Sequence, residues 1–213
     1  MPRSINDIYN FYRYIVRKER GVFVTIPQAM ANLDAGQLDC FQEYFKLYGM
    51  DGTVHDALSP FRVYYMFTSD AAGNVTYPSD YEHIVGDSYT VTGSTVNVIT
   101  AVNDDEFVSA LMSQLRPVSL MSPICIDRAN GFQIYPSTLQ IGFFTYLKRP
   151  ATPVLDYTQS GRDITYVPAG STQLEWTDAY INNIIAKALR YAGINMDEQG
   201  ISQFAEMYNA ETK

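Results

Sequence analysis

Reactive and metal-binding side chains are scarce in this chain of 213 residues. It has two cysteines, Cys40 and Cys125, and two histidines, His55 and His83. So few cysteines exclude a disulfide-stapled secreted scaffold, and both lie in patterns that favour small buried side chains, although a disulfide between them stays open. Neither histidine has a partner ligand at a metal-site spacing. We therefore expect no metal and no other cofactor.

Catalytic signatures are also missing. The chain has no Gly-x-Ser-x-Gly, no Walker A sequence and no Gly-x-Gly-x-x-Gly. Its acidic cluster, Asp104-Asp105-Glu106, lacks the alternating ligands of a calcium loop and suits a helix N-terminus. We predict that the protein is not an enzyme. A cell-wall glycan hydrolase stays open, because paired carboxylates can be distant in sequence, and so does a small-molecule-binding β domain.

Charge is low and mostly negative, with 18% charged residues and a net charge of −8. This argues against a nucleic-acid-binding surface built on lysine and arginine. The one basic group lies at the end of the first predicted helix, where Arg13, Arg17, Lys18 and Arg20 either complement the helix C-terminus or form a docking edge for an acidic partner. No apolar run approaches the length of a membrane span, and the N-terminus has no leader-like apolar region, so we expect cytoplasmic synthesis and no membrane partner.

Aromatic residues are abundant, with 17 tyrosines and 11 phenylalanines. Tyrosine suits surfaces that are buried against a partner while one end stays wet, but aromatic residues also fill β-strands. Both interpretations stay open. The hydrophobic fraction of 46% predicts an ordered chain.

Helical patterns occupy both ends of the chain and strand patterns the middle. Ser4 caps the first helix and Gly21 ends it, and Pro27 opens a second helix that we expect to break around residues 34–36. A capping box at residues 172–175 opens a C-terminal helix that buries Trp176, and a last helix follows. The predicted fold class is α+β: a helical bundle from both termini (residues 1–50 and 171–213) with an inserted antiparallel β domain (residues 51–170).

The β-rich insertion contains one hairpin signal and one predicted helix. Asn130-Gly131 predicts a type I′ turn, followed by a third strand at residues 139–147 in an antiparallel meander. We expect a short helical turn at residues 77–81. After Asn103 we expect a helix whose apolar face contains Phe107, Val108, Leu111, Met112 and Leu115.

A second, weaker hairpin is predicted at residues 154–167. Proline flanks both of its strands, which is typical of an edge or a projecting arm. We predict an interface made of this arm and of the basic end of the first helix, with these candidate residues: Asp156, Tyr157, Arg162, Tyr166, Arg17, Lys18 and Arg20.

An ordered series of short segments resembles head–tail connector (adaptor, neck or ring) proteins of tailed bacteriophages, especially crAss-like and related phages of Bacteroidota. The series spans residues 26–193. It consists of Ile26-Pro27-Gln28-Ala29-Met30, Cys40-Phe41-Gln42-Glu43-Tyr44-Phe45, Tyr77-Pro78-Ser79-Asp80-Tyr81-Glu82-His83-Ile84, the helix at residues 105–115 with Arg116-Pro117 and Ser122-Pro123, Gln133-Ile134-Tyr135-Pro136, Phe144-Thr145-Tyr146-Leu147-Lys148-Arg149-Pro150, and Leu174-Glu175-Trp176.

The resemblance implies an architectural role in the virion neck. Identical copies would form a ring, twelve-fold like the portal beneath which it lies, that binds the portal and the next tail component. The ring would extend the DNA channel without binding DNA specifically, and an acidic chain suits this because a basic lining would hold phosphates. The arm could add to a neighbouring copy by β-augmentation. Another virion part, such as a tail-tube, tail-hub or minor capsid protein, is the alternative.

Overall fold

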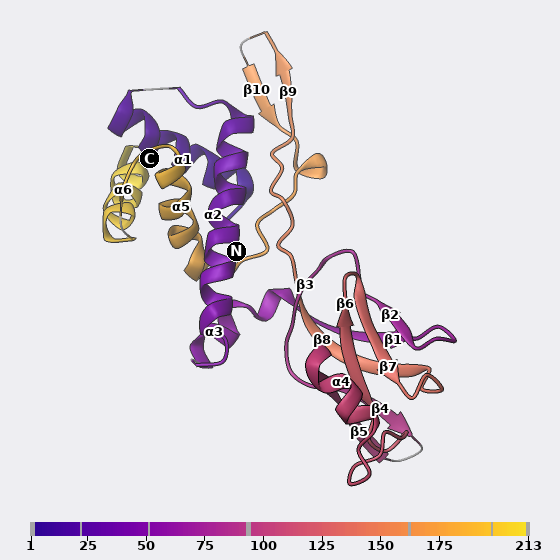
Figure 1. The fold of residues 1–213 in the computed structure, drawn as a ribbon. Coiled ribbons are helices and arrows are strands. Elements are labelled where there is room, and N and C mark those ends of the chain that lie inside the picture. The colour runs from indigo at the N-terminus through magenta and orange to yellow at the C-terminus, as the bar shows by residue number, and fades with distance from the viewer. Residues whose placement is uncertain are drawn as a thin grey trace. The chain divides into compact units, whose positions relative to one another are not determined.

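The computed structural model describes residues 3–21, 23–50, 52–92, 95–161, 163–196 and 198–211. The chain divides into two compact units (Figure 1). The helical unit consists of Met1–Pro60 and Pro150–Lys213, and the β unit of Phe61–Arg149. Helices near both termini flank a β-sheet region, so the predicted α+β class is confirmed.

The boundaries of the β unit differ from those of the predicted insertion. Residues 51–60 and 150–170, which we placed in the insertion, belong to the helical unit. The returning segment is held there by an antiparallel bridge between Val154 and Thr172 and by the buried side chain of Leu155. The predicted hairpin is therefore part of the helical unit.

The first helix of the helical unit begins and ends at the capping residues that the sequence predicts. Ser4 caps the first helix, since its Oγ accepts a hydrogen bond from the Asp7 amide at 3.1 Å, and Gly21 ends this helix with a left-handed φ of 64°. The helices are α1 (Ile5–Arg20), α2 (Ile26–Leu47), α3 (Gly52–Ala57), α5 (Asp178–Tyr191) and α6 (Glu198–Glu211).

Helix α2 runs without interruption through residues 34–36, so the predicted break is wrong. The reason is the position of Gly36 against α5. A Cβ atom at Gly36 would lie 2.8 Å from the Ala188 nitrogen and from the Ile184 oxygen. Gly36 is therefore a packing residue, which lets two helix backbones approach closely, rather than a helix stop.

The core of the helical unit is formed by one face of each of its long helices. Helix α6 adds rings to it, with Phe204 6.4 Å from Tyr14 and Tyr208 5.7 Å from Phe11 between ring centroids. Fully buried members from the four helices are Ile8, Tyr12, Ile15, Leu33, Phe41, Ile184, Ile185, Leu189 and Ile201.

Helix α5 begins after Thr177, not at the predicted capping box. Thr172 lies in extended backbone, where its amide donates to the Val154 carbonyl at 2.8 Å. Trp176 therefore precedes the helix. It is buried as predicted and packs against Tyr44, with 5.9 Å between ring centroids.

The β unit is an eight-stranded sheet with the order β1-β8-β4-β5-β6-β7-β2, and β3 pairs with β8 beside this path. All pairs are antiparallel except β5–β6, which the crossover helix α4 (Asp104–Leu111) joins. The strand predicted at residues 139–147 is present as β8, but its predicted place in the meander is wrong, because β8 pairs with β1, β3 and β4 instead of β7. The strands are β1 (Arg62–Thr68), β2 (Asn74–Thr76), β3 (Tyr81–Ile84), β4 (Ser88–Thr92), β5 (Thr95–Val102), β6 (Ile124–Arg128), β7 (Gly131–Tyr135) and β8 (Ile141–Lys148).

The hairpin β6–β7 is present, but its turn is not of type I′. Its two loop residues are Ala129 and Asn130, since Arg128 pairs with Gly131. No described residue other than glycine has a positive φ, and Gly131 does not have one either. Gly131 is needed for another reason: it pairs with Thr76 of β2, and a Cβ there would overlap the Val75 carbonyl.

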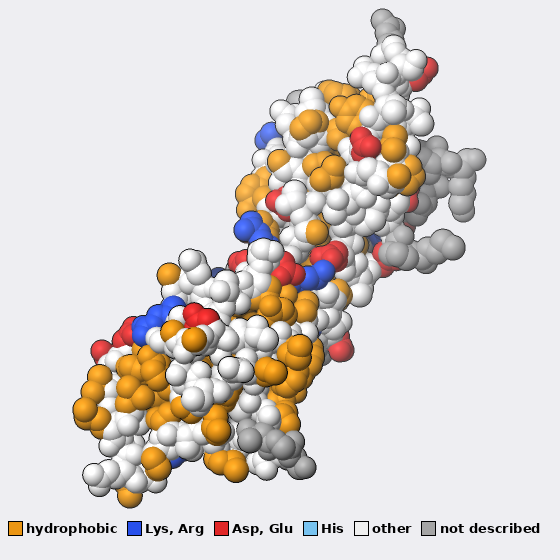
Figure 2. All heavy atoms as spheres, turned by 90° about the vertical axis from the view of Figure 1, so that its right-hand side faces the viewer, with side chains coloured by type: hydrophobic (Ala, Val, Ile, Leu, Met, Phe, Trp, Pro, Cys, Tyr) orange, Lys and Arg blue, Asp and Glu red, His pale blue; other side chains and the backbone are white. Residues whose placement is uncertain are grey.

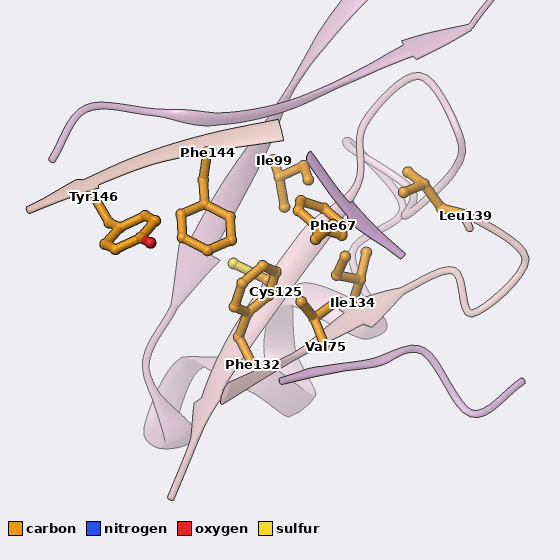
Figure 3. Close-up of a cluster of buried hydrophobic side chains, with 9 residues drawn as sticks. All are labelled: Phe67, Val75, Ile99, Cys125, Phe132, Ile134, Leu139, Phe144 and Tyr146. Atoms are coloured by element: carbon orange, nitrogen blue, oxygen red, sulfur yellow. The ribbon is translucent and has the colours of Figure 1, made fainter. Parts of the chain in front are cut away.

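The predicted helical turn at residues 77–81 is also wrong. A bend at Ser79 and Asp80 leads directly into β3, and the rings of Tyr77 and Tyr81 stack with centroids 3.9 Å apart. The core of the β unit lies between the two halves of its curved sheet, where side chains from β1, β5 and β8 meet those from β2, β6 and β7 (Figure 3).

Candidate assembly interface

The predicted hairpin is present as a two-stranded arm in the helical unit. Strands β9 (Tyr157–Ser160) and β10 (Asp163–Tyr166) pair from Tyr157↔Tyr166 to Ser160↔Asp163. They form a sheet of their own (Figure 1). Nearly every side chain of this sheet is exposed. No other described strand pairs with their outer edges, which leaves backbone N–H and C=O groups available for a further strand.

The root of the arm is fixed by hydrogen bonds. The Val167 amide donates to the Asp156 carbonyl at 2.9 Å, the Asp156 amide donates to Ser171 Oγ at 2.9 Å, and that hydroxyl donates to the Val167 carbonyl at 2.8 Å. The Asp156 carboxylate accepts from the Tyr157 amide at 2.9 Å. Asp156, one of the predicted interface residues, therefore fixes the base of the arm through its hydrogen bonds, and its carboxylate is already engaged with the Tyr157 amide.

The inner side of the arm faces α1. Gln173 bridges the two elements, since its Nε2 donates to the Tyr166 hydroxyl at 3.0 Å and its Oε1 accepts from the Ile5 amide at 2.6 Å. A hollow of about 260 Å³ separates the arm from the helix. It is lined by Asn6, Tyr9, Asn10, Arg13, Ile26, Leu155, Ile164 and Tyr166.

The arm exposes apolar side chains along its length. Ile164 is 51% exposed and Tyr157 is 37% exposed. Tyr157 and Tyr166 lie opposite each other in the register, so the predicted pair of tyrosines sits at the base of the arm. Arg162, which we also predicted as an interface residue, lies outside the described residues.

The basic end of α1 divides into structural and surface residues. Arg20 donates from Nη2 to the Gly193 carbonyl at 3.1 Å, so it stabilises the turn that follows α5. The Lys18 ammonium lies 5.3 Å from the centre of the Tyr14 ring. Arg17 lines a second hollow, of about 400 Å³, together with Arg13, Gly21 and Phe23.

The arm and the end of α1 form one surface, because Arg13 lines both hollows. Two of its residues, Phe23 and Ile164, were missing from the prediction, and Arg13 was named in the basic group but not among the candidate interface residues. Phe23 is 70% exposed. Its position in the short connection between Gly21 and Pro27, outside any helical pattern, is a signal that the sequence does contain.

The histidines and cysteines have structural surroundings. His55 Nε2 lies 2.9 Å from the Tyr48 carbonyl, and its ring stacks on the Tyr48 ring. Burial lowers the pKa of His83. Cys40 and Cys125 are buried thiols that are not joined in a disulfide, which answers the open question, and burial raises the pKa of Cys125 to about 12. Among the described residues, no group of three or more His, Cys, Asp and Glu is placed to hold a metal ion.

A third hollow of about 260 Å³ opens on the β unit, where Tyr77, Asp87, Cys125, Asp127 and Phe132 are among its lining residues. It lies just below the usual range of about 300–1,000 Å³ for small-molecule pockets. Within the part of the chain that the structure describes, no helix has the length and apolar character of a membrane span.

Comparison with known proteins assigns no family. No protein-family model matches the sequence, and no curated protein matches it at a significant level. The resemblance to phage head–tail connectors stays a prediction.

Proposed function

We propose that the protein is a non-enzymatic virion structural protein, copies of which form a ring in the neck of a tailed bacteriophage and join the portal to the tail. The observation that carries the proposal is the arm β9–β10, which has two unpaired strand edges and exposed side chains along both strands. Hydrogen bonds of Asp156 and Ser171 hold the base of the arm in place. The ordered segments that resemble connector proteins point to the neck rather than to another assembly.

The arm suits contact between neighbouring copies. In a closed ring each copy uses two different faces, so that the arm of one copy meets another surface of the next. The outer edge of β9 or β10 can extend a sheet or strand of the neighbour through backbone hydrogen bonds. Exposed Ile164 and Tyr157 then supply apolar contact at the same place.

Charge supports the same arrangement. The chain has a net charge of −8, so a neighbouring copy is on average an acidic partner. Arg13 and Arg17, on the surface that joins the arm to the end of α1, are attracted to such a partner and help to orient it. An acidic ring would also let DNA pass without holding its phosphates.

An affinity pull-down tests the proposal. The tagged chain is recovered from phage-infected host lysate, and its partners are identified by mass spectrometry. We expect portal and neck or tail proteins in near-stoichiometric amounts, and the same chain in purified particles. Recovery with tail-tube, tail-hub or capsid proteins would instead identify another virion part. Recovery of the chain alone, together with its absence from particles, would contradict a structural role, and a turbidity assay on cell walls would then test the hydrolase.

A further inference from the structure

The β unit has a large apolar surface on the outer side of its sheet. We define the sheet-face patch as Tyr64, Met66, Tyr89, Val98, Ile141 and Phe143, which come from β1, β4, β5 and β8. Tyr64 and Met66 are each 57% exposed, and Ile141 and Val98 are about half exposed. Figure 2 shows hydrophobic side chains gathered on the visible face of this unit.

Strand register makes the sheet-face patch continuous. Met66 pairs with Phe143, Phe143 with Tyr89, and Tyr89 with Val98, so one row of side chains crosses four strands. The rings of Tyr64 and Tyr89 each lie 5.5 Å from the Phe143 ring between centroids. The hydroxyls of Tyr64 and Tyr89 are hydrogen-bonded at 2.6 Å. These contacts hold the aromatic rings in place before any partner binds, which lowers the entropic cost of binding.

A second apolar surface begins on α4 and continues into the segment that follows it. We define the α4 patch as Val108, Leu111, Met112, Leu115, Leu120 and Met121. Met112 is 77% exposed, and Leu115 is fully exposed. The sequence predicts that the first four share the apolar face of a helix that runs to residue 115, but α4 ends at Leu111 and none of its residues is buried. Apart from Phe107, whose ring packs against Tyr135, the apolar face of this helix is therefore exposed in the described chain.

The two patches lie on opposite sides of the core of the β unit. Phe67 and Phe144 point into the core, so the alternating positions Met66 and Phe143 point away from it. On the other half of the sheet, Ile134 points into the core and Tyr135 points outward, where its ring lies 5.0 Å from that of Phe107 on α4. The core lies between the two halves (Figure 3).

We propose that the sheet-face patch of one copy docks on the α4 patch of the next copy, in a head-to-tail contact. This inference rests on the self-assembly part of the proposed function and names its second contact surface. Two different apolar faces on opposite sides of one unit are what a heterologous, ring-forming contact requires. A face-to-face dimer through the sheet would leave the α4 patch exposed.

The sizes of the two patches agree with such a contact. A fully exposed side chain of this size presents roughly 150–200 Å², so the sheet-face patch exposes roughly 350–550 Å² and the α4 patch roughly 550–750 Å². A standard protein–protein interface buries about 800 Å² per partner, and isolated monomers rarely expose apolar patches above about 300–600 Å². The α4 patch is therefore large enough to cover the sheet-face patch, and together with a polar rim the contact reaches the size of a specific interface.

Cysteine cross-linking between copies tests the proposal. Full-length V98C with an affinity tag is mixed with untagged M112C, and the mixture is oxidised. Both positions are exposed, so neither variant should disturb folding, and the native thiols Cys40 and Cys125 are buried. The control replaces M112C with T76C, an exposed strand position of the same unit outside both patches. The experiment is done on the purified chain at high concentration and on phage particles that carry the variants.

We expect a tagged–untagged heterodimer with V98C and M112C, and its loss with V98C and T76C. Cross-linking of V98C with itself at the expense of the heterodimer would overturn the head-to-tail contact in favour of a face-to-face dimer. No heterodimer above the control, in either the purified chain or particles, would also overturn it. If the heterodimer forms but the chain is absent from particles, the head-to-tail contact is supported and the neck role is refuted. If the chain is present in particles with the portal but no heterodimer forms, the neck role is supported and the head-to-tail contact is refuted.

Discussion

The close approach of α2 and α5 at Gly36 gives a sharp test of the helical unit. Replacing Gly36 with alanine adds one methyl group, whose carbon would lie 2.8 Å from two backbone atoms of α5. Ordinary van der Waals contact begins at 3.4 Å, so the two helices must separate by about 0.6 Å at this point. Backbone atoms cannot rotate away as the end of a long side chain can.

Two opposing effects set the magnitude. Alanine favours the helix over glycine by about 1 kcal/mol. Overpacking costs about 1–3 kcal/mol. Separating the helices also opens a gap along the rest of their contact, and a gap of about 0.5–1 Å loses about a quarter to a half of the dispersion energy between the separated atoms. The buried neighbours that would separate include Leu33 and Cys40 on α2 and Ile184 and Ala188 on α5. We therefore expect G36A to lower the free energy of unfolding by about 1–2 kcal/mol.

Urea denaturation followed by circular dichroism measures this change. The matched control is G52A, at the start of α3, where an added Cβ has no atom within 4 Å. The control should be as stable as the native chain or slightly more stable, because alanine reduces the entropy of the unfolded state. A G36A variant as stable as G52A would refute the packing role of Gly36.

Three further outcomes follow from buried groups. W176A should lose about 3–5 kcal/mol in the same denaturation assay, and a loss of assembly with an unchanged midpoint would instead place this side chain in an interface. Burial and the hydrogen bond to Asp80 raise the pKa of Tyr146 to about 12. The unfolded chain therefore releases this proton first, so stability should fall as the pH rises from about 10 to 12, and less steeply in Y146F. Cys40 and Cys125 should resist a thiol reagent until the chain unfolds; fast labelling of the native protein would contradict their burial.

Local signals in the sequence predicted the local features of the fold. Ser4 and Gly21 bound α1 as expected, because a capping box and a left-handed glycine act through neighbouring residues alone. The arm was predicted at residues 154–167 from two short strand patterns around a turn, although its strands are Tyr157–Ser160 and Asp163–Tyr166 and Val154 pairs with Thr172 instead. The arm is the part of the candidate interface that could be found without the structure.

Three of the errors share one cause, which is that a glycine or threonine was interpreted without its distant neighbours. Gly36 allows α2 to pack closely against α5, which lies about 150 residues later in the chain, and Gly131 leaves room for β2. Thr172 is held in extended backbone by Val154. The apolar face of α4 was expected to be core, and only the structure reveals that it is exposed. Periodicity identifies an apolar face but not what covers it.

The most direct test of the central claim is the incorporation of an arm-shortened chain into phage particles. Removing Gln159, Ser160, Asp163 and Ile164 shortens each strand by two residues. The remaining cross-strand pairs keep their side chains on the same faces, and the turn at Gly161 is retained. The Asp156 and Ser171 contacts at the root stay intact, so the purified variant should unfold at the same urea concentration as the native chain. We predict that the tagged native chain is found in purified particles with the portal protein and that the shortened chain is absent from them. Equal incorporation of the two chains, or absence of both, would contradict a ring that is assembled through this arm.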